Sequence, residues 1–347
     1  MTNGKLDANA MVKSGMYNFY TSGIDVYKID KYSFEGEGIS IAGNGVNMGY
    51  MHLVSGKYNA YQRTYILNNI KIDRHFLFYN LWKNFWEFCQ KNTREGSIPY
   101  LLYNDISDFK IFKSHSNEQQ KIGKLLENID NLITLEEIKL NKLKQLKQTL
   151  LQKMFPEGNS KTPRIRFKGF DEEWKEEKLD DIFKVITGGE PPKNYKNSKH
   201  PVGEYKYPIY SNGQEANAIW GFSDNYSINT EAITISSIGT IGFPVVRKMF
   251  FTPIIRLKTL LPYNKNMNIN FLNLSVSQIN FSFNQAGIPS MNSNQLKDNI
   301  ILILRNFSEQ QKIGDFFCKI DTLINLYNSK LNKLRQIKEA LLQKMFV

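Results

Sequence analysis

A block of 38 residues occurs twice in this chain, and it constrains the fold more than any other feature. Glu118–Phe155 and Glu309–Phe346 align at a constant offset of 191 without a gap, and 24 of the 38 positions are identical. Identity at this level indicates an internal duplication. Each copy follows a different globular segment. The sequence therefore predicts a pseudo-twofold molecule with two globular domains and two long helices.

Both copies carry apolar residues at intervals of three and four, which is typical of a long amphipathic helix. At a rise of 1.5 Å per residue, each helix would be roughly 50–55 Å long. A lone helix of this kind must bury its apolar stripe, and its simplest partner is the other copy in an antiparallel spacer. The residues that we expect to pack the two helices together are Ile122, Ile129, Leu132, Leu143, Leu150, Ile313, Ile320, Leu323, Leu334 and Leu341.

The apolar pattern is interrupted at the same place in both copies. Glu136 and Lys139 stand there in the first copy, and Tyr327 and Lys330 stand there in the second. A shared polar interruption indicates a device that sets the helix register or a contact with a partner. An exposed turn that is simply tolerated explains it equally well.

The segments between the helices contain short apolar, strand-like runs separated by Gly, Asn and Pro turns, as at Ile39–Ala42 and Ala232–Ile235. We therefore expect an α+β protein with two mixed α/β domains joined by the helical spacer. The predicted boundaries are 1–115 for the first domain, 116–155 for the first helix, 156–163 for a linker, 164–305 for the second domain and 306–347 for the second helix.

The two globular segments are weaker copies of each other. Tyr17–Gly23 matches Tyr207–Gly213, and Ile98-Pro99 matches Ile288-Pro289, both at an offset of 190. The opening of the second segment, Arg164–Trp174, would have its counterpart before Met1. We therefore expect a first domain that is shortened at its N-terminus, by truncation or an internal start, or that another chain completes.

The charge balance favours a polyanionic partner. The chain has 45 Lys and Arg against 33 Asp and Glu, a formal charge of +12, and DNA or RNA is the partner that such a surplus best fits. The two cysteines, Cys89 and Cys318, are far apart, as expected in a reducing cytosol. We find no apolar leader and no run of about 18 apolar residues, so we expect a cytoplasmic protein without a membrane span.

Catalytic signatures are missing from the sequence. It contains no GxxxxGK[ST] phosphate loop and no HExxH motif, and its four histidines are scattered. Gly43–Gly49 is one residue too long for a dinucleotide loop, and we interpret it as a hairpin turn. We therefore expect no catalytic residue, no metal site and no cofactor in this chain.

Polar and basic loops are the remaining candidates for function. Tyr58–Thr64, Lys193–His200 and Asn284–Asn292 are rich in groups that hydrogen-bond to bases and phosphates, although each is also compatible with an ordinary solvated loop. From these loops and the matched segments we select as candidate DNA-contacting residues Lys5, Tyr20, Thr21, Ser22, Asn44, Tyr61, Gln62, Arg63, Lys193, Lys196, Tyr210, Ser211, Asn212, Ser237, Gln285, Ser290 and Asn292.

The paired EQQKIG…LNKL…LLQKMF blocks resemble the two central helices of specificity subunits of type I restriction–modification systems. Arg164–Trp174 resembles the start of a target recognition domain in that family, and Gly4–Met11, Ile41–Gly45 and Tyr58–Thr64 resemble parts of the first such domain. The resemblance covers nearly the whole chain. It implies that each domain recognises one half of a bipartite sequence in double-stranded DNA, while the helices set the gap between the halves.

The same resemblance implies the partners. Two modification subunits, which are methyltransferases, would bind the helices and bring S-adenosylmethionine for adenine methylation. Restriction subunits would bring ATP hydrolysis and, with Mg²⁺, cleavage. Two alternatives remain open from the sequence: a stand-alone DNA methyltransferase or nuclease with a degenerate motif, and a truncated homologue that occupies modification subunits as a defective or inhibitory partner.

Overall fold

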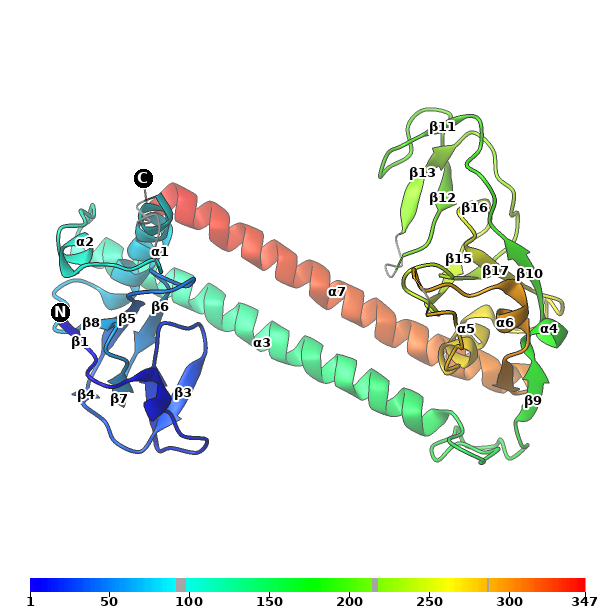
Figure 1. The fold of residues 1–347 in the computed structure, drawn as a ribbon, viewed down its shortest axis with the longest axis horizontal. Helices are drawn as coiled ribbons and strands as arrows, with labels where there is room; N and C mark the ends of the chain where they lie inside the picture. The colour runs from blue at the N-terminus through cyan, green and yellow to red at the C-terminus, as the bar shows by residue number, and fades with distance from the viewer. Residues whose placement is uncertain (92–97, 214–217, 286, 347) are drawn as a thin grey trace. The chain divides into compact units, whose positions relative to one another are not determined.

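The computed structural model describes residues 1–91, 98–213, 218–285 and 287–346 and divides the chain into two compact units (Figure 1). Unit 1 comprises Met1–Leu140 and Tyr327–Val347, and unit 2 comprises Asn141–Leu326. Each unit is a mixed α/β domain with part of both long helices, as the predicted fold class requires. The predicted boundaries kept the helices apart from the domains, whereas the structure divides each helix between the units.

Unit 1 contains two four-stranded sheets, and a parallel pair of strands lies at the centre of one of them. The antiparallel sheet has the order β1 (Thr2–Asn3), β8 (Thr64–Leu67), β5 (Gly38–Ala42), β6 (Met51–Val54). The second sheet has the order β3 (Val26–Ile29), β2 (Tyr17–Tyr20), β7 (Lys57–Ala60), β4 (Phe34–Glu35), with β2 parallel to β7. The unit also contains the short 3-10 helix η1 (Ala8–Ala10) and helices α1 (Arg74–Lys91) and α2 (Tyr103–Ser107).

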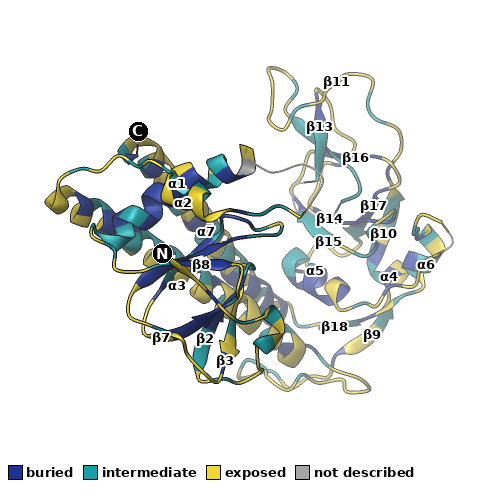
Figure 2. Ribbon diagram, turned by 60° about the vertical axis from the view of Figure 1, so that its left-hand side comes forward, coloured by how far each residue is buried: buried dark blue, intermediate teal, exposed yellow. Residues whose placement is uncertain are grey.

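The core of unit 1 forms where β5 meets α1. Ile39 and Ile41 of β5 are fully buried and belong to the same cluster as Phe76, Tyr79 and Phe85 of α1. The aromatic density of α1 therefore serves packing. Strands β7 and β8 are also largely buried (Figure 2), so the residues of these two strands serve mainly the fold.

Unit 2 repeats this plan with one additional sheet. Its sheets have the orders β10-β17-β14-β15, β11-β13-β12-β16 and β18-β9. The strands are β9 (Lys175–Lys178), β10 (Phe183–Thr187), β11 (Tyr195–Lys196), β12 (Tyr207–Tyr210), β13 (Ile219–Ser223), β14 (Ala232–Ile235), β15 (Pro244–Arg247), β16 (Thr252–Pro253), β17 (Lys258–Pro262) and β18 (Ile300–Ile303). The short helices are α4 (Leu179–Ile182), α5 (Ile269–Ser277) and α6 (Ser293–Lys297).

The duplicated blocks form α3 (Ser116–Met154) and α7 (Phe307–Met345), whose segments lie side by side and antiparallel within each unit (Figure 1). In unit 1 the amino group of Lys338 lies 2.6 Å from Asp130, and Arg335 lies 2.6 Å from Glu137. In unit 2 Lys147 lies 2.5 Å from Asp321. Ion pairs thus connect the two helices in both units.

Most of the residues predicted to pack the helices are at least partly buried, but two are not. Leu132 and Leu323 are 38% and 46% exposed, so their predicted packing role is wrong. The apolar pattern covers more than one face of each helix, and the inward face is taken by other residues, including buried Leu126, Leu140 and Leu331. Ile122 and Leu341 pack into the domain core of unit 1, and Leu143, Leu150, Ile313 and Ile320 pack into that of unit 2. Ile129 and Leu334 are partly buried.

The polar interruption is a charge cluster around one buried carboxylate and not an exposed turn. The side chain of Glu136 is only 3% exposed and lies 3.1 Å from Lys139 and 3.2 Å from Lys330. Lys139 and Lys330 occupy the same position in the two copies, so both copies direct a cation to one carboxylate. The hydrogen bond from Lys139, followed by that from Lys330, lowers the pKa of Glu136.

The shared Gln and Gly at the start of each block hold the block against its own domain. The side-chain oxygens of Gln119 and Gln310 accept the backbone N–H of Asp73 and Asn268, at 3.3 and 2.9 Å. Asp73 and Asn268 each accept an N–H at the start of the following helix, α1 or α5. A Cβ at Gly123 would collide with Asp73, and one at Gly314 with Asn268, so only glycine permits this approach.

Candidate nucleic-acid interface

The parallel pairing of β2 and β7 brings two loops of unit 1 together. Tyr20 and Ala60 are paired at the ends of these strands, and the N–H of Tyr61 donates to the carbonyl of Tyr20 at 2.9 Å. Because parallel strands end at the same edge of a sheet, the loops that contain Ser22 and Arg63 leave the sheet side by side.

Further hydrogen bonds connect these loops to two more segments. The hydroxyl of Ser22 donates to the side-chain oxygen of Asn44 at 2.5 Å, and the N–H of Gly43 donates to the carbonyl of Arg63 at 2.8 Å. The side-chain amide of Gln62 donates to Asp7 at 2.8 Å. The structure thus places six predicted residues in one cluster, the unit 1 loop cluster: Lys5, Ser22, Asn44, Tyr61, Gln62 and Arg63. Lys5, Gln62 and Arg63 are exposed.

Tyr20 and Thr21 are not part of that exposed surface. Tyr20 is 5% exposed, and its ring packs edge-on against Tyr58. Thr21 is 8% exposed, and its hydroxyl oxygen accepts the N–H of Gly23. Both side chains stabilise the domain, and we remove them from the candidate DNA contacts.

Unit 2 repeats the arrangement with different residues. Strand β12 is parallel to β16, and the N–H of Ile254 donates to the carbonyl of Tyr210 at 2.9 Å. The side chain of Asn212 donates to the carbonyl of Ile255 at 2.5 Å and accepts the N–H of Ser237 at 2.8 Å. The unit 2 loop cluster therefore contains Ser211, Asn212, Ile255 and Arg256.

A proline loop closes each cluster through the same two hydrogen bonds. In unit 1 the N–H of Gly45 donates to Pro99 at 2.8 Å, and that of Leu101 donates to Gly43 at 2.7 Å. In unit 2 the N–H of Gly239 donates to Pro289 at 2.8 Å, and that of Met291 donates to Ser237 at 2.9 Å. The main-chain frame is therefore common to both clusters, while the side chains that it presents differ.

Arg256 is a candidate contact that the sequence reasoning missed. It stands two residues after Ile254, as Arg63 stands two residues after Tyr61, and both arginines are exposed. Ile255 and Arg256 have φ values of 51° and 60°, a conformation that costs energy for residues other than glycine. A search at a fixed offset of 190 places Pro253 opposite Arg63 and so conceals the match.

Lys258 lies directly beyond this loop and is another missed residue. It is 5% exposed, and its amino group donates to the hydroxyls of Thr187 and Ser293 at 3.0 and 2.9 Å. Burial, and then the charge of Arg256, lowers the pKa of Lys258. Because the ammonium is buried and already bonded to two hydroxyls, Lys258 supports the unit 2 loop cluster from within the fold, as Tyr20 supports that of unit 1.

Several other predicted residues have structural contacts. Ser237 is 1% exposed, and its hydroxyl donates to the carbonyl of Arg256. The guanidinium carbon of Arg247 lies over the ring of Tyr210, 3.9 Å from the ring centroid. Asn292 caps α6 by accepting the N–H of Gln295, and Ser290 pairs through its backbone with Asn284. Ser237, Tyr210 and Asn292 therefore support the loops.

The remaining predicted residues lie at other places in unit 2. Lys193 and Lys196 are exposed beside or within β11, at the opposite edge of the sheet from β16. The amino group of Lys196 lies 5.4 Å from the ring centroid of Tyr205. Gln285 is exposed in the proline loop. Lys193 and Lys196 thus offer positive charge away from the loop cluster.

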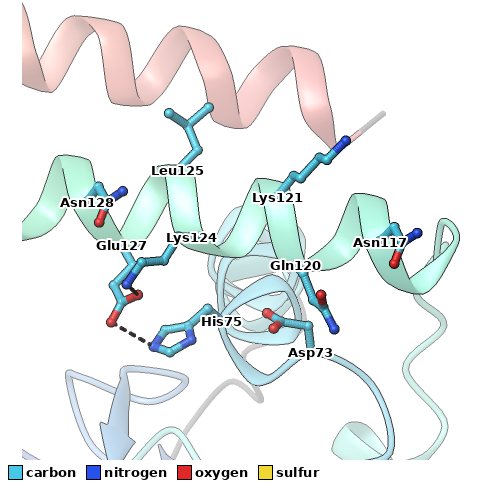
Figure 3. Close-up of a pocket in the computed structure, with 9 residues that line it drawn as sticks. All are labelled: Asp73, His75, Asn117, Gln120, Lys121, Lys124, Leu125, Glu127 and Asn128. Carbon is cyan, nitrogen blue, oxygen red and sulfur yellow. Dashed lines mark hydrogen bonds and ion pairs between the residues drawn. The ribbon is translucent and has the colours of Figure 1, made fainter.

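A shallow pocket of about 720 Å³ lies against α3 in unit 1 (Figure 3). In it His75 lies 3.4 Å from Glu127, and none of the residues of the unit 1 loop cluster lines it. Among the described residues, no group of three or more His, Cys, Asp or Glu side chains is arranged to hold a metal ion. None of the helices in the described ranges is long and apolar enough to cross a membrane.

Comparison with solved structures gives the same fold. The S subunit of a type I restriction–modification system from M. genitalium matches 100% of this chain and 93% of its own with a TM-score of 0.72 at 19% identity. A chain from a structural study of complex assembly and conformational transition of the type I R-M system matches 100% of this chain and 95% of its own, with a TM-score of 0.53 at 14% identity.

Sequence relatives agree. A stretch of 127 residues, 37% of this chain, is 35% identical to the EcoDI specificity subunit of Escherichia coli but spans only 28% of that protein. A putative type I specificity subunit of Mycoplasma pneumoniae is 30% identical over 276 residues, 78% of this chain and 81% of the relative. The family model for the type I restriction modification DNA specificity domain matches residues 2–145 and 171–336. The chain therefore belongs to the family of type I restriction–modification DNA specificity subunits.

Proposed function

We propose that this chain is the DNA-recognising subunit of a type I restriction–modification complex and that each loop cluster recognises one half of a bipartite target. The observation that carries this proposal is the shared frame of the two clusters. Tyr61 and Ile254 make the same main-chain bond, and the proline loops close both clusters identically. A common frame with different side chains is what two different half-site specificities require.

The charges around the clusters support binding to duplex DNA. Arg63 and Arg256 are exposed on equivalent loops, and an arginine fork is suited to guanine or to a phosphate. The exposed Lys5, Lys193 and Lys196 would add contacts to the backbone phosphates. These contacts would be salt-dependent and largely independent of sequence.

The long helices offer two equivalent apolar patches for partner subunits. The unit 1 patch consists of Leu132, Leu135 and Ile337, which are 38%, 55% and 50% exposed. The unit 2 patch consists of Leu323, Leu326 and Leu146, which are 46%, 60% and 51% exposed. The three residues of one patch match those of the other at the offset of 191. We propose that each patch binds one modification subunit.

The chemistry would then reside on the partners. The modification subunits would bring S-adenosylmethionine and methylate adenine, and restriction subunits would bring ATP hydrolysis and Mg²⁺-dependent cleavage. The role of this chain is to bind and position DNA. We place the complex in the cytoplasm, where Cys89 and Cys318, which form no disulfide, would stay reduced.

The test is to sequence the methylated positions in DNA treated with this chain, its modification subunit and S-adenosylmethionine. We expect a split motif with modified adenine in both halves. A reaction without the specificity chain provides the control. A stable complex that methylates no specific site would instead identify a homologue that occupies modification subunits without DNA recognition.

A further inference from the structure

The segment Arg164–Lys178 is an integral part of unit 2. The guanidinium of Arg166 makes two hydrogen bonds, of 2.7 and 2.9 Å, to the fully buried carboxylate of Glu309. Trp174 is also fully buried, with ring centroids 5.2 and 5.5 Å from Phe155 and Phe271. Strand β9, at the end of the segment, pairs with β18. The segment thus supplies an ion pair, an aromatic side chain and a strand.

Unit 1 contains the matching receptor residues. Glu118 and Phe346 correspond to Glu309 and Phe155 at the offset of 191. Phe76 corresponds to Phe271, because each is the third residue after the side chain that caps its helix. Each of the three residues that contact Arg166 or Trp174 in unit 2 therefore has an equivalent residue in unit 1.

These receptor residues line an open pocket in unit 1. Phe76, Glu118 and Phe346 surround a cavity of about 400 Å³, together with Lys110–Lys113 and Ile122. Glu118 is exposed, whereas Glu309 is fully buried. Lys110–Lys113 follows α2 and is therefore the equivalent of β18, which follows α6. Unlike β18, this segment is not paired in a strand, and Phe112 within it is 84% exposed. We call this cavity the unit 1 pocket.

The neighbouring surface of α3 continues the match. In unit 2, Phe167 packs against Phe316 with centroids 6.1 Å apart, and Lys312 lies 4.8 Å from the ring centroid of Phe170. Their equivalents in unit 1 are Leu125, which is 40% exposed, and Lys121, which is exposed. Both point away from Asp73 and His75 (Figure 3). An extended segment would therefore find apolar and cationic contacts beyond the unit 1 pocket.

We propose that the unit 1 pocket binds an extended polypeptide segment that carries an arginine for Glu118, a tryptophan eight residues later and a strand-forming sequence after it. The pattern Arg-x-Arg-Phe-x-Gly-Phe occurs once in this sequence, at Arg164–Phe170, and that copy is engaged in unit 2. A bidentate arginine–carboxylate pair would fix the orientation of the bound segment. The tryptophan would bury more apolar surface than any other side chain of the segment. The following residues would pair with Ile111–Lys113 by strand addition. This inference does not depend on the proposed DNA recognition.

The test uses the full chain and a fluorescently labelled synthetic peptide with the sequence of Arg164–Leu179. We expect saturable binding of one peptide per chain by fluorescence anisotropy. Replacing the tryptophan in the peptide (W174A) should weaken binding about tenfold or more, because a buried aromatic contact is lost. Glu118→Arg in the protein should weaken it to a similar degree, and a peptide with the R166E change should restore binding to that variant.

Two further measurements decide where the peptide binds. Glu339→Arg reverses an exposed charge that lies outside the unit 1 pocket, and it should leave the affinity unchanged. Hydrogen exchange should slow at Ile111–Lys113 when the peptide is added. The proposal is overturned if no saturable binding occurs, if Glu118→Arg binds as well as the unaltered chain, or if protection appears only at β18, which would show exchange into unit 2.

Discussion

At the scale of single residues, the two loop clusters separate side chains that support the fold from side chains that are free to contact a ligand. Tyr20 and Ser237 have polar groups suited to DNA, yet both are buried. Arg63 was identifiable from its polar surroundings, whereas Arg256 lies between apolar Ile255 and Leu257 and has no such signal. Local composition predicts an exposed contact only where the whole loop is polar.

Arg63 and Arg256 should each affect one half-site. Arg63→Ala should weaken binding about tenfold or relax base choice in one half of the target only, and Arg256→Ala should do the same in the other half, because one bidentate contact contributes about 1–3 kcal/mol. Methylation sequencing with each variant measures this. Gln148→Ala, an exposed change on α3, is the control. Unchanged specificity in either variant removes that arginine from the interface.

Lys258 should support the unit 2 loop cluster without contacting DNA itself. Lys258→Met keeps most of the side-chain volume but removes the hydrogen bonds to Thr187 and Ser293, so affinity for DNA should fall. The slope of log affinity against log salt should stay the same, because no phosphate contact is lost. Fluorescence anisotropy at several salt concentrations checks this, with Lys319→Met on α7 as an exposed control. A slope smaller by about one would show instead that Lys258 contacts a phosphate.

At the scale of elements, the duplication predicted α3 and α7 well, because identity over a long gapless block preserves the period of a helix. The choice of inward face was harder, since apolar residues cover more than one face and Leu132 and Leu323 are exposed. Sheet order was not predictable, because the pairing of β2 with β7 joins strands far apart in the sequence. The position of the polar interruption was predictable from the sequence. That Lys139 and Lys330 both bind the carboxylate of Glu136 was visible only in the structure.

The Glu136 cluster should make stability depend on pH. Lys139 and Lys330 lower the folded-state pKa of Glu136 below its ordinary 4.5, so the carboxylate stabilises the fold above that pH. This contribution should be lost as the pH falls through the lowered pKa. Glu136→Gln should therefore melt at a lower temperature than the unaltered chain near pH 7, and the difference should shrink below pH 4.5.

The measurement is the melting temperature across that pH range, by circular dichroism of both proteins. Glu339→Gln, an exposed neutralisation on α7, should show no comparable difference at any pH. A constant difference between Glu136→Gln and the unaltered chain down to pH 3 would show that packing, and not charge, accounts for the effect.

At the scale of the whole molecule, the two units share one plan and differ in detail. Both have a parallel strand pair, a proline loop and an apolar patch on the long helices. The duplication predicted this repetition, including the match of Ile98-Pro99 with Ile288-Pro289. The division of each helix between the units was not predicted, because a continuous helical pattern contains no mark of a domain boundary.

Each apolar patch should determine the binding of one partner. Leu135→Asp should reduce the number of bound modification subunits from two to one, Leu326→Asp should do the same, and the double variant should bind none. Burial of one leucine contributes about 1.5–3 kcal/mol, so each change should weaken one site about tenfold or more. Native mass spectrometry gives the stoichiometry, and Ser329→Asp on the exposed surface of α7 is the control. Two subunits bound to the double variant would place the docking surface elsewhere.

The single carboxylate between Lys139 and Lys330 has a consequence for how such a chain can be rearranged. The first copy contains Glu136 and the second has Tyr327 at the same position, so only the first copy supplies the carboxylate, whereas both copies supply a lysine. If the second half were paired with another of itself, two lysines would meet there without Glu136. If the first half were paired with itself, two Glu136 carboxylates would meet two Lys139 side chains, and the cluster would keep its opposite charges. Exchange of halves should therefore preserve this charge cluster only in combinations that contain at least one first copy.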